Sequence, residues 1–119
     1  MQEAGRSTRL AELNRLRKRA HARLVGSGSK VYAKFLELEE ATYAPRTLDR
    51  KTKLLIGTSV SVVVNCDACM QWHVEEAAAA GATVAELIEA IEVAIKMGGA
   101  PAVVASRLAF EVIDDVFRS

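Results

Sequence analysis

Two cysteines and a histidine lie close together near the middle of the 119-residue chain. They are Cys66, Cys69 and His73, spaced by three and four residues, so on an α-helix their side chains would share one face. A thiolate, rather than a thiol, attacks disulfides and peroxides. A helix N-terminus would favour the thiolate of Cys66, whereas His73 can accept the proton of Cys69 or stabilise its thiolate. The spacing therefore predicts a redox-active cysteine pair and leaves open which cysteine attacks.

Other interpretations of this cluster are weaker. Asp67 opposes thiolate formation through its negative charge, and a histidine beside Trp72 can be an ordinary half-buried side chain. We favour redox chemistry because the only two cysteines stand three residues apart, with the histidine four further on. A zinc site is disfavoured because the cluster offers three ligands where a structural site takes four, and His21 lies in a different segment. We expect no metal, and no cofactor, because Gly98-Gly99 lacks the spacing of a phosphate loop.

The first elements expected from the sequence are two helices joined by a flexible link. Leucines at three- and four-residue steps predict an amphipathic helix over residues 9–24. A short Gly/Ser link at residues 26–29 ends it, and a second helix is expected over residues 30–42, before Pro45. The candidate buried residues of this second helix are Val31, Phe35, Leu36 and Leu38.

The segment at residues 48–64 is polar for one turn and then apolar on nearly every side. Its three consecutive valines, residues 62–64, suit a buried strand. We favour a buried helix, because the apolar character extends over about 11 residues and the neighbouring segments are helical.

Three further helices are predicted toward the C-terminal end. The first, residues 66–80, carries the cysteine motif and ends before Gly81. Thr83 and Glu86 form a capping-box pattern at the start of the second, which ends near residue 97. The last has Pro101 in its first turn and runs to about residue 117. The residues expected on the buried faces of these last two helices are Leu87, Ile88, Ile91, Ala94, Ile95, Val104, Leu108, Val112, Ile113 and Val116.

These elements predict an all-α fold of five or six helices. We divide the chain into residues 1–28, a basic N-terminal helix with its Gly/Ser link, and residues 29–119, a helical domain. Half of the residues are apolar, and one predicted helix is apolar on most of its surface. Because a chain of this size has little core in which to bury that excess, we expect a homo-oligomer.

The net charge of +1 conceals an uneven distribution. Residues 1–30 contain eight basic and two acidic side chains, a formal charge of +6, and the other 89 residues carry −5. A basic arm can bind nucleic acid, but this one has no aromatic residue for base stacking and no known binding motif. We therefore expect no nucleic-acid partner, and expect the basic helix to pack against an acidic body of its own or a neighbouring subunit.

Composition also limits the class of protein. Two cysteines in a chain of this length exclude a disulfide scaffold. The longest strongly apolar run falls short of the roughly 20 residues that span a membrane, and the first ten residues lack the apolar core of a secretory signal. We therefore expect a globular protein of the reducing cytoplasm, with no membrane partner.

Three stretches of the chain resemble the carboxymuconolactone decarboxylase superfamily, specifically its AhpD-like alkylhydroperoxidase branch. They are LDRKTKLLIG, NCDACMQWHVEEAAAAGAT and KMGGAPAVV. The resemblance implies an all-α fold assembled into trimers or hexamers, and a thiol-based peroxide-reducing or disulfide-exchange activity. It also implies that Cys69 attacks the hydroperoxide, that Cys66 resolves the product as an intramolecular disulfide, and that His73 belongs to a proton relay.

Two positions depart from the pattern of that branch. The branch has a glutamate twelve residues before the first motif cysteine and a histidine immediately before the second, where this chain has Leu54 and Ala68. Neither side chain can carry a proton. The relay is therefore either shortened to His73 and water or completed by a carboxylate of the second predicted helix. Of the two adjacent glutamates there, Glu39 and Glu40, we take Glu40 as the candidate relay acid.

The function predicted from these residues is reduction of organic hydroperoxides, with an external dithiol or a thiol protein as the reductant. A protein-disulfide reductase with weak peroxidase activity is one alternative, favoured by the missing relay groups. A non-catalytic redox sensor or scaffold, whose basic helix binds a partner, is another. Lactone decarboxylation is less favoured, because the enzymes that name the superfamily lack the cysteine pair.

Overall fold

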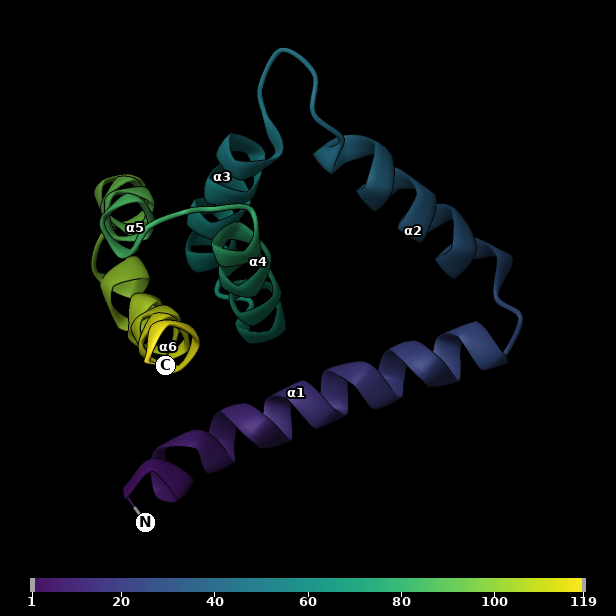
Figure 1. Ribbon diagram of the computed structural model, residues 1–119, viewed down its shortest axis with the longest axis horizontal. Helices are drawn as coiled ribbons and strands as arrows, with labels where there is room; N and C mark the ends of the chain where they lie inside the picture. The colour runs from purple at the N-terminus through teal and green to yellow at the C-terminus, as the bar shows by residue number, and fades with distance from the viewer. Residues whose placement is uncertain (1, 119) are drawn as a thin grey trace. The chain divides into compact units, whose positions relative to one another are not determined.

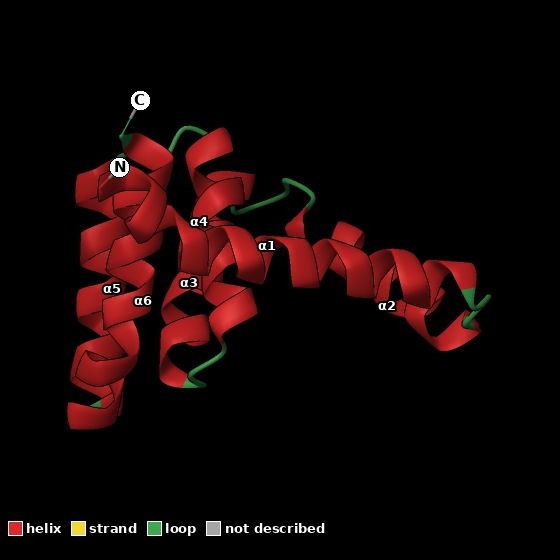
Figure 2. Ribbon diagram, turned by 90° about the horizontal axis from the view of Figure 1, so that it is seen from below, coloured by secondary structure: helices red, strands yellow, loops and turns green. Residues whose placement is uncertain are grey.

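The computed structural model describes residues 2–118, and within these residues all regular structure is α-helical (Figure 2). The helices are α1 Gln2–Gly26, α2 Lys30–Tyr43, α3 Arg50–Val63, α4 Asp67–Ala79, α5 Val84–Gly98 and α6 Ala100–Phe117 (Figure 1). The prediction of an all-α fold of five or six helices is confirmed. None of the described helices is both long and apolar enough to cross a bilayer.

The helices form two compact units, Met1–Ala44 and Pro45–Ser119. In the first unit, α1 and α2 meet at a turn in which Ser29 Oγ caps α2 by accepting a hydrogen bond from the Tyr32 N–H at 3.0 Å. His21 Nδ1 and the Tyr32 hydroxyl lie 2.6 Å apart and join the two helices. Helix α1 extends beyond the predicted residues 9–24 at both ends. The prediction followed the leucine stripe, and a helix can continue past its apolar stripe where the flanking residues tolerate helical backbone.

The predicted burial of α2 is wrong. No residue of α2 is buried, and Val31, Phe35 and Leu38 are 82%, 54% and 61% exposed, while Leu36 is partly covered. The physical reason is that an apolar stripe is buried only where another element packs on it. Within its own unit α2 has α1 as its neighbour, and the two helices meet close to their connecting turn. The apolar face of α2 therefore remains exposed.

The second unit is a bundle of α3, α4, α5 and α6. Helix α3 packs against the other three, and α6 also packs against α4 and α5. The largest fully buried side chains of the bundle come from all four helices and are Leu54, Thr58, Val62, Met70, Val74, Leu87, Ile91 and Val112. This core fixes the relative positions of α3 and α4, which carry the cysteine motif and its neighbours.

Helix α3 resolves the choice between helix and strand at residues 48–64 in favour of the helix. Asp49 caps it, accepting a hydrogen bond from the Thr52 N–H at 2.8 Å. The expectation of a buried helix holds for one face of α3. Its core face is buried, whereas Ile56, Val60 and Val63 on the other side are exposed, because no element of the second unit covers them.

The junctions around α5 follow the predicted signals. The capping box is confirmed: the Glu86 N–H donates to Thr83 Oγ1 at 3.1 Å, and the Thr83 N–H donates to Glu86 Oε1 at 2.9 Å. Most of the predicted inward residues of α5 and α6 are buried or half-buried. Val104 is an exception, since it is 55% exposed on the first turns of α6, where no helix of the unit covers it.

Candidate functional site

The turn between α3 and α4 places Cys66 at the start of the motif helix. Asn65 adopts a left-handed conformation with φ 56°, which reverses the chain direction within three residues. The Cys66 N–H then donates to the Ser61 carbonyl oxygen at 3.1 Å and fixes this cysteine against the end of α3. Cys66 is therefore the N-cap of α4, one residue outside the helix that was predicted to begin with it.

Cys66 and Cys69 form a disulfide, with their Cα atoms 5.2 Å apart. Both residues are partly exposed, so small molecules and partner thiols can approach them. The Cys69 N–H points at Cys66 Sγ at a distance of 3.2 Å. That contact and the N-terminal end of the helix both favour negative charge on the Cys66 sulfur once the pair is reduced.

His73 meets Cys69 through the backbone. Its Nδ1 lies 2.7 Å from the Cys69 carbonyl oxygen and 3.3 Å from Ser61 Oγ. A carbonyl oxygen can only accept, so Nδ1 must carry the hydrogen. In the neutral ring the basic nitrogen is then Nε2. The structure thus brings all three motif residues together at one end of α4, and it also selects one tautomer of the histidine.

Ser61 is a member of this cluster that sequence reasoning missed. Its side chain is 3% exposed, and its hydroxyl donates to the Gly57 carbonyl oxygen at 2.7 Å. With its only hydrogen used there, Ser61 Oγ can act toward His73 solely as an acceptor. The signal in the sequence was one of three hydroxyl side chains, with Thr58 and Ser59, in the mainly apolar residues 54–63 of a helix that packs against the motif helix.

Trp72 packs against the side of the histidine ring. The two ring centroids are 4.9 Å apart and the planes meet at 83°, an edge-to-face arrangement. Together with the two Nδ1 contacts, this restricts the rotation of the imidazole. The site therefore presents a partly exposed dithiol pair beside an oriented imidazole, a combination suited to thiolate chemistry.

The positions that depart from the alkylhydroperoxidase pattern have structural roles here. Leu54 is fully buried in the core of the second unit, and Ala68 lies in the first turn of α4. Glu40, the candidate relay acid, is exposed on α2 in the first unit. Its role stays a prediction.

Comparison with known proteins agrees with this fold. The chain belongs to the carboxymuconolactone decarboxylase family, whose sequence profile matches residues 29–112. It is similar to a crystal structure of a protein of that family from Legionella pneumophila, with a TM-score of 0.86, 25% identity, and coverage of 91% of this chain and 96% of that one. A family member from Thermotoga maritima, described as a candidate for a role in the antioxidative response, superimposes with a TM-score of 0.80 at 30% identity, covering 90% and 91% of the two chains.

A curated relative comes from Paracoccus denitrificans. It is described as an uncharacterized protein of the cox locus and is 34% identical over 90 residues, which is 76% of this chain and 81% of the relative.

Proposed function

We propose that the protein is a thiol-dependent oxidoreductase that reduces organic hydroperoxides through Cys66 and Cys69, with His73 as proton relay. The observation that carries the proposal is the position of the cysteine pair. Both cysteines of the chain lie within disulfide distance at the N-terminal end of α4, and an oriented imidazole donates a hydrogen bond to the Cys69 carbonyl oxygen. Family membership and a relative linked to the antioxidative response support it.

The proposed cycle has three steps. The Cys69 thiolate attacks the terminal oxygen of ROOH; the O–O bond breaks, Cys69 becomes a sulfenic acid, and the alkoxide takes a proton to leave as ROH. The Cys66 thiol condenses with the sulfenic acid, forming the disulfide and releasing water. An external dithiol then exchanges with the disulfide, restoring both thiols and becoming oxidised itself. A reducing cytoplasm would supply that dithiol.

His73 supplies the proton movement of the first step. With Nδ1–H held by the Cys69 carbonyl and Ser61, Nε2 is the nitrogen that accepts the thiol proton and returns it to the leaving alkoxide. The assignment of Cys69 as the attacking cysteine rests on the family resemblance. Placing the base on the residue one turn after Cys69 is consistent with it.

Protein-disulfide reduction is the second candidate function, and one contact favours it. The Cys69 N–H directed at Cys66 Sγ stabilises a thiolate on Cys66, which would make Cys66 the sulfur that attacks a partner disulfide. Leu54 and Ala68 cannot relay protons, and this also favours protein-disulfide reduction over peroxide reduction. In this reaction a mixed disulfide with Cys66 forms first, and Cys69 then releases the reduced partner.

The decisive experiment follows cumene hydroperoxide consumption by the reduced protein in the presence of dithiothreitol. We expect sustained consumption by the wild type and none by Cys69→Ser. Cys66→Ser, reduced beforehand and then freed of dithiothreitol, should consume about one equivalent and accumulate a sulfenic acid detectable by mass spectrometry. His73→Ala should slow the reaction by about 100-fold or more, whereas His21→Ala, which changes the other histidine, should not. If the reduced wild type leaves the peroxide intact but reduces insulin disulfides, the protein is a disulfide reductase and not a peroxidase.

A further inference from the structure

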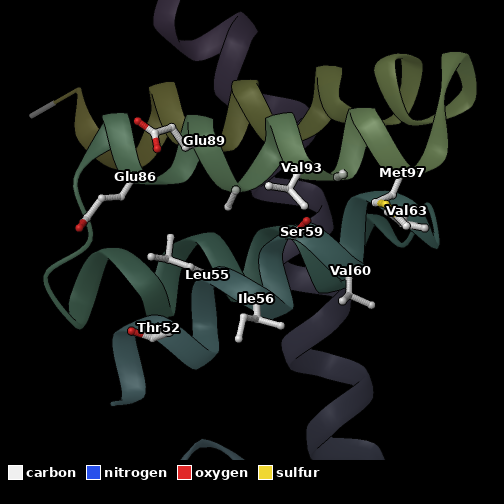
Figure 3. A pocket seen from close by; sticks show the side chains of 12 residues that line it. Thr52, Leu55, Ile56, Ser59, Val60, Val63, Glu86, Glu89, Val93 and Met97 are labelled. Atoms are coloured by element: carbon white, nitrogen blue, oxygen red, sulfur yellow. The ribbon is translucent and has the colours of Figure 1, made fainter. Parts of the chain in front are cut away.

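An apolar groove lies between α3 and α5 of the second unit (Figure 3). It has a volume of about 540 Å³, and Figure 3 shows Leu55 and Val93 directed into the space between the two helices. Val60 of α3 and Val93 and Met97 of α5 contribute to its walls, and all three are exposed. Contiguous exposed apolar side chains of this kind mark a binding surface.

Helix α2 carries the complementary feature, an exposed apolar stripe. Val31, Phe35 and Leu38 are spaced by four and three residues and so lie on one face of the helix. This i, i+4, i+7 pattern is the one by which a helix anchors in an apolar groove. The stripe is about 10 Å long and the α3 wall of the groove about 16 Å, so the stripe fits within it.

Helix α2 also needs a partner on energetic grounds. It has 14 residues and buries none of them, and isolated helices of this length are marginal in water. Its N-cap, Ser29, contributes only about 1 kcal/mol. A well-formed α2 is therefore best explained if its apolar face is covered in the working protein.

The charges on the two surfaces define the direction of docking. Glu86 and Glu89 line the groove end where α5 begins, and Glu86 is already paired with Lys51 of α3 at 3.0 Å. Lys96 lies in the last turn of α5, next in sequence to the lining residue Met97. Helix α2 has the opposite order, with Lys34 in its first half and three glutamates, residues 37, 39 and 40, in its second. In the parallel direction the lysines of α2 lie toward Glu89 and its glutamates toward Lys96, whereas the antiparallel direction would bring those glutamates toward Glu89.

The link between α2 and α3 disfavours docking into the groove of the same copy. In the parallel direction, with the stripe centred on the groove, Tyr43 and Arg50 would lie roughly 24 Å apart along the axis and about 8–10 Å apart sideways. Only residues 44–49 connect them, and that chain spans at most about 25 Å when fully extended. It is not fully extended, because the Arg46 N–H donates to the Leu48 carbonyl oxygen at 3.0 Å.

We propose that α2 of one copy docks into the α3–α5 groove of a second copy of this chain, parallel to α5. Each copy carries both this stripe and this groove, so a reciprocal exchange covers both surfaces in a closed assembly. The proposal does not depend on the redox function, since none of the residues it uses belongs to the cysteine site.

Photo-crosslinking between differently labelled copies tests the identity of the occupant. Benzoylphenylalanine replaces Phe35 in the intact chain, and unlabelled and nitrogen-15 chains are unfolded together in urea, refolded and irradiated. Mass spectrometry should find position 35 joined to peptides of α3 or α5, with light–heavy pairs among the products. Crosslinks confined to single copies, or to other helices, would overturn the proposal.

Matched valine substitutions test the groove itself. Val93→Lys places a charge in the groove, and Val104→Lys places one at a site of nearly equal exposure on α6, 55% against 58%, outside it. By sedimentation, Val93→Lys should weaken self-association at least about tenfold, and Val104→Lys should leave it within about twofold. Circular dichroism verifies that both variants fold. A monomeric wild type, or equal effects of the two substitutions, would contradict docking between copies.

A charge exchange tests the direction. Glu89→Lys should weaken association by bringing like charges together. Adding Lys30→Glu should restore it, because Lys30 lies near the N-terminal end of the stripe and approaches Glu89 only in the parallel direction. Failure of the second substitution to restore association would show that α2 does not lie parallel to α5 and would refute the proposed arrangement.

Discussion

At the candidate site, one ring nitrogen of His73 lies within hydrogen-bond distance of two groups. Nδ1 of His73 faces two acceptors, the Cys69 carbonyl oxygen at 2.7 Å and Ser61 Oγ at 3.3 Å. Ser61 is held in this acceptor role because its own hydrogen goes to Gly57. Ser61 is thus a positioning residue: it adds a second acceptor to the Cys69 carbonyl oxygen, which holds the hydrogen on Nδ1 and leaves Nε2 as the basic nitrogen.

Replacing Ser61 with alanine should loosen this control. In Ser61→Ala we expect a smaller fraction of neutral His73 with the hydrogen on Nδ1, and peroxide turnover reduced by about three- to tenfold, the effect of one hydrogen bond. Nitrogen-15 chemical shifts of the imidazole report the tautomer directly. Ser106→Ala is the matched control: Ser106 is also 3% exposed and donates to a backbone carbonyl, that of Val103, but it belongs to α6. Equal shifts and rates in both variants would deny Ser61 this role.

At the scale of elements, the connection between α5 and α6 depends on close approach. A Cβ added at Gly98 would lie 2.8 Å from the Cβ of Ala102, a distance that requires the backbone to move. Gly98→Ala should therefore destabilise the fold by about 1–3 kcal/mol in urea unfolding. Ala102→Gly in the same chain should recover part of this loss by removing the colliding atom, and a double-mutant cycle measures the coupling. Strictly additive effects would exclude the contact as the cause.

Glu86 connects the capping box of α5 to α3, and it should make the free energy of unfolding depend on pH in the acidic range. Hydrogen bonds from the Thr83 backbone and then from Lys51 Nζ, at 3.0 Å, lower the pKa of its carboxyl below the ordinary value of 4.5. A carboxyl whose pKa is lower in the folded state than in the unfolded state adds stability at pH values above its unfolded-state pKa. That stability is lost as the pH falls through the folded-state pKa. Glu86→Gln should therefore flatten the fall in unfolding free energy below about pH 5. Glu92→Gln, also on α5, should keep the wild-type slope.

The elements show how far sequence reasoning reaches. Local signals predicted their ends well, because the Thr83–Glu86 capping box and Pro101 act within a few residues. Burial was harder, because it depends on which elements meet. Phe35 and Val104 have the spacing of core residues and are exposed, and nothing local to them says that no helix of their unit covers them. The motif residues were predictable from spacing, whereas Ser61 joins the site only through the packing of α3 on α4.

At the scale of the whole molecule, the proposed exchange of α2 bears on the missing relay acid. With α2 parallel to α5, its glutamate-rich end lies at the groove end formed by Val63 and Met97. Val63 precedes Cys66 by three residues in the sequence. Glu40 of one copy would then approach the site of another. Glu40→Gln should lower peroxide turnover about tenfold or more and change its pH profile, whereas Glu37→Gln should not. A wild-type rate in Glu40→Gln would leave His73 and water as the relay.

The division into two units leads to a prediction about their independence. The largest fully buried side chains all come from α3 to α6, so a fragment of residues 45–119 contains the packing that stabilises the cysteine site. We expect it to unfold cooperatively, to form the Cys66–Cys69 disulfide and to sediment as a monomer, because it has lost the stripe but kept the groove. Residues 1–44 alone should lose most of the helicity of α2, which has no buried residue.

Circular dichroism, thiol titration and sedimentation of the two fragments measure these properties. Adding the 1–44 fragment to the 45–119 fragment should restore helicity to α2, because docking supplies the apolar cover that the helix lacks by itself. Val93→Lys in the larger fragment should abolish that gain and Val104→Lys should not, since only the first changes the groove. An unfolded 45–119 fragment would mean that the bundle depends on α1 and α2 for its stability, contrary to the distribution of its core.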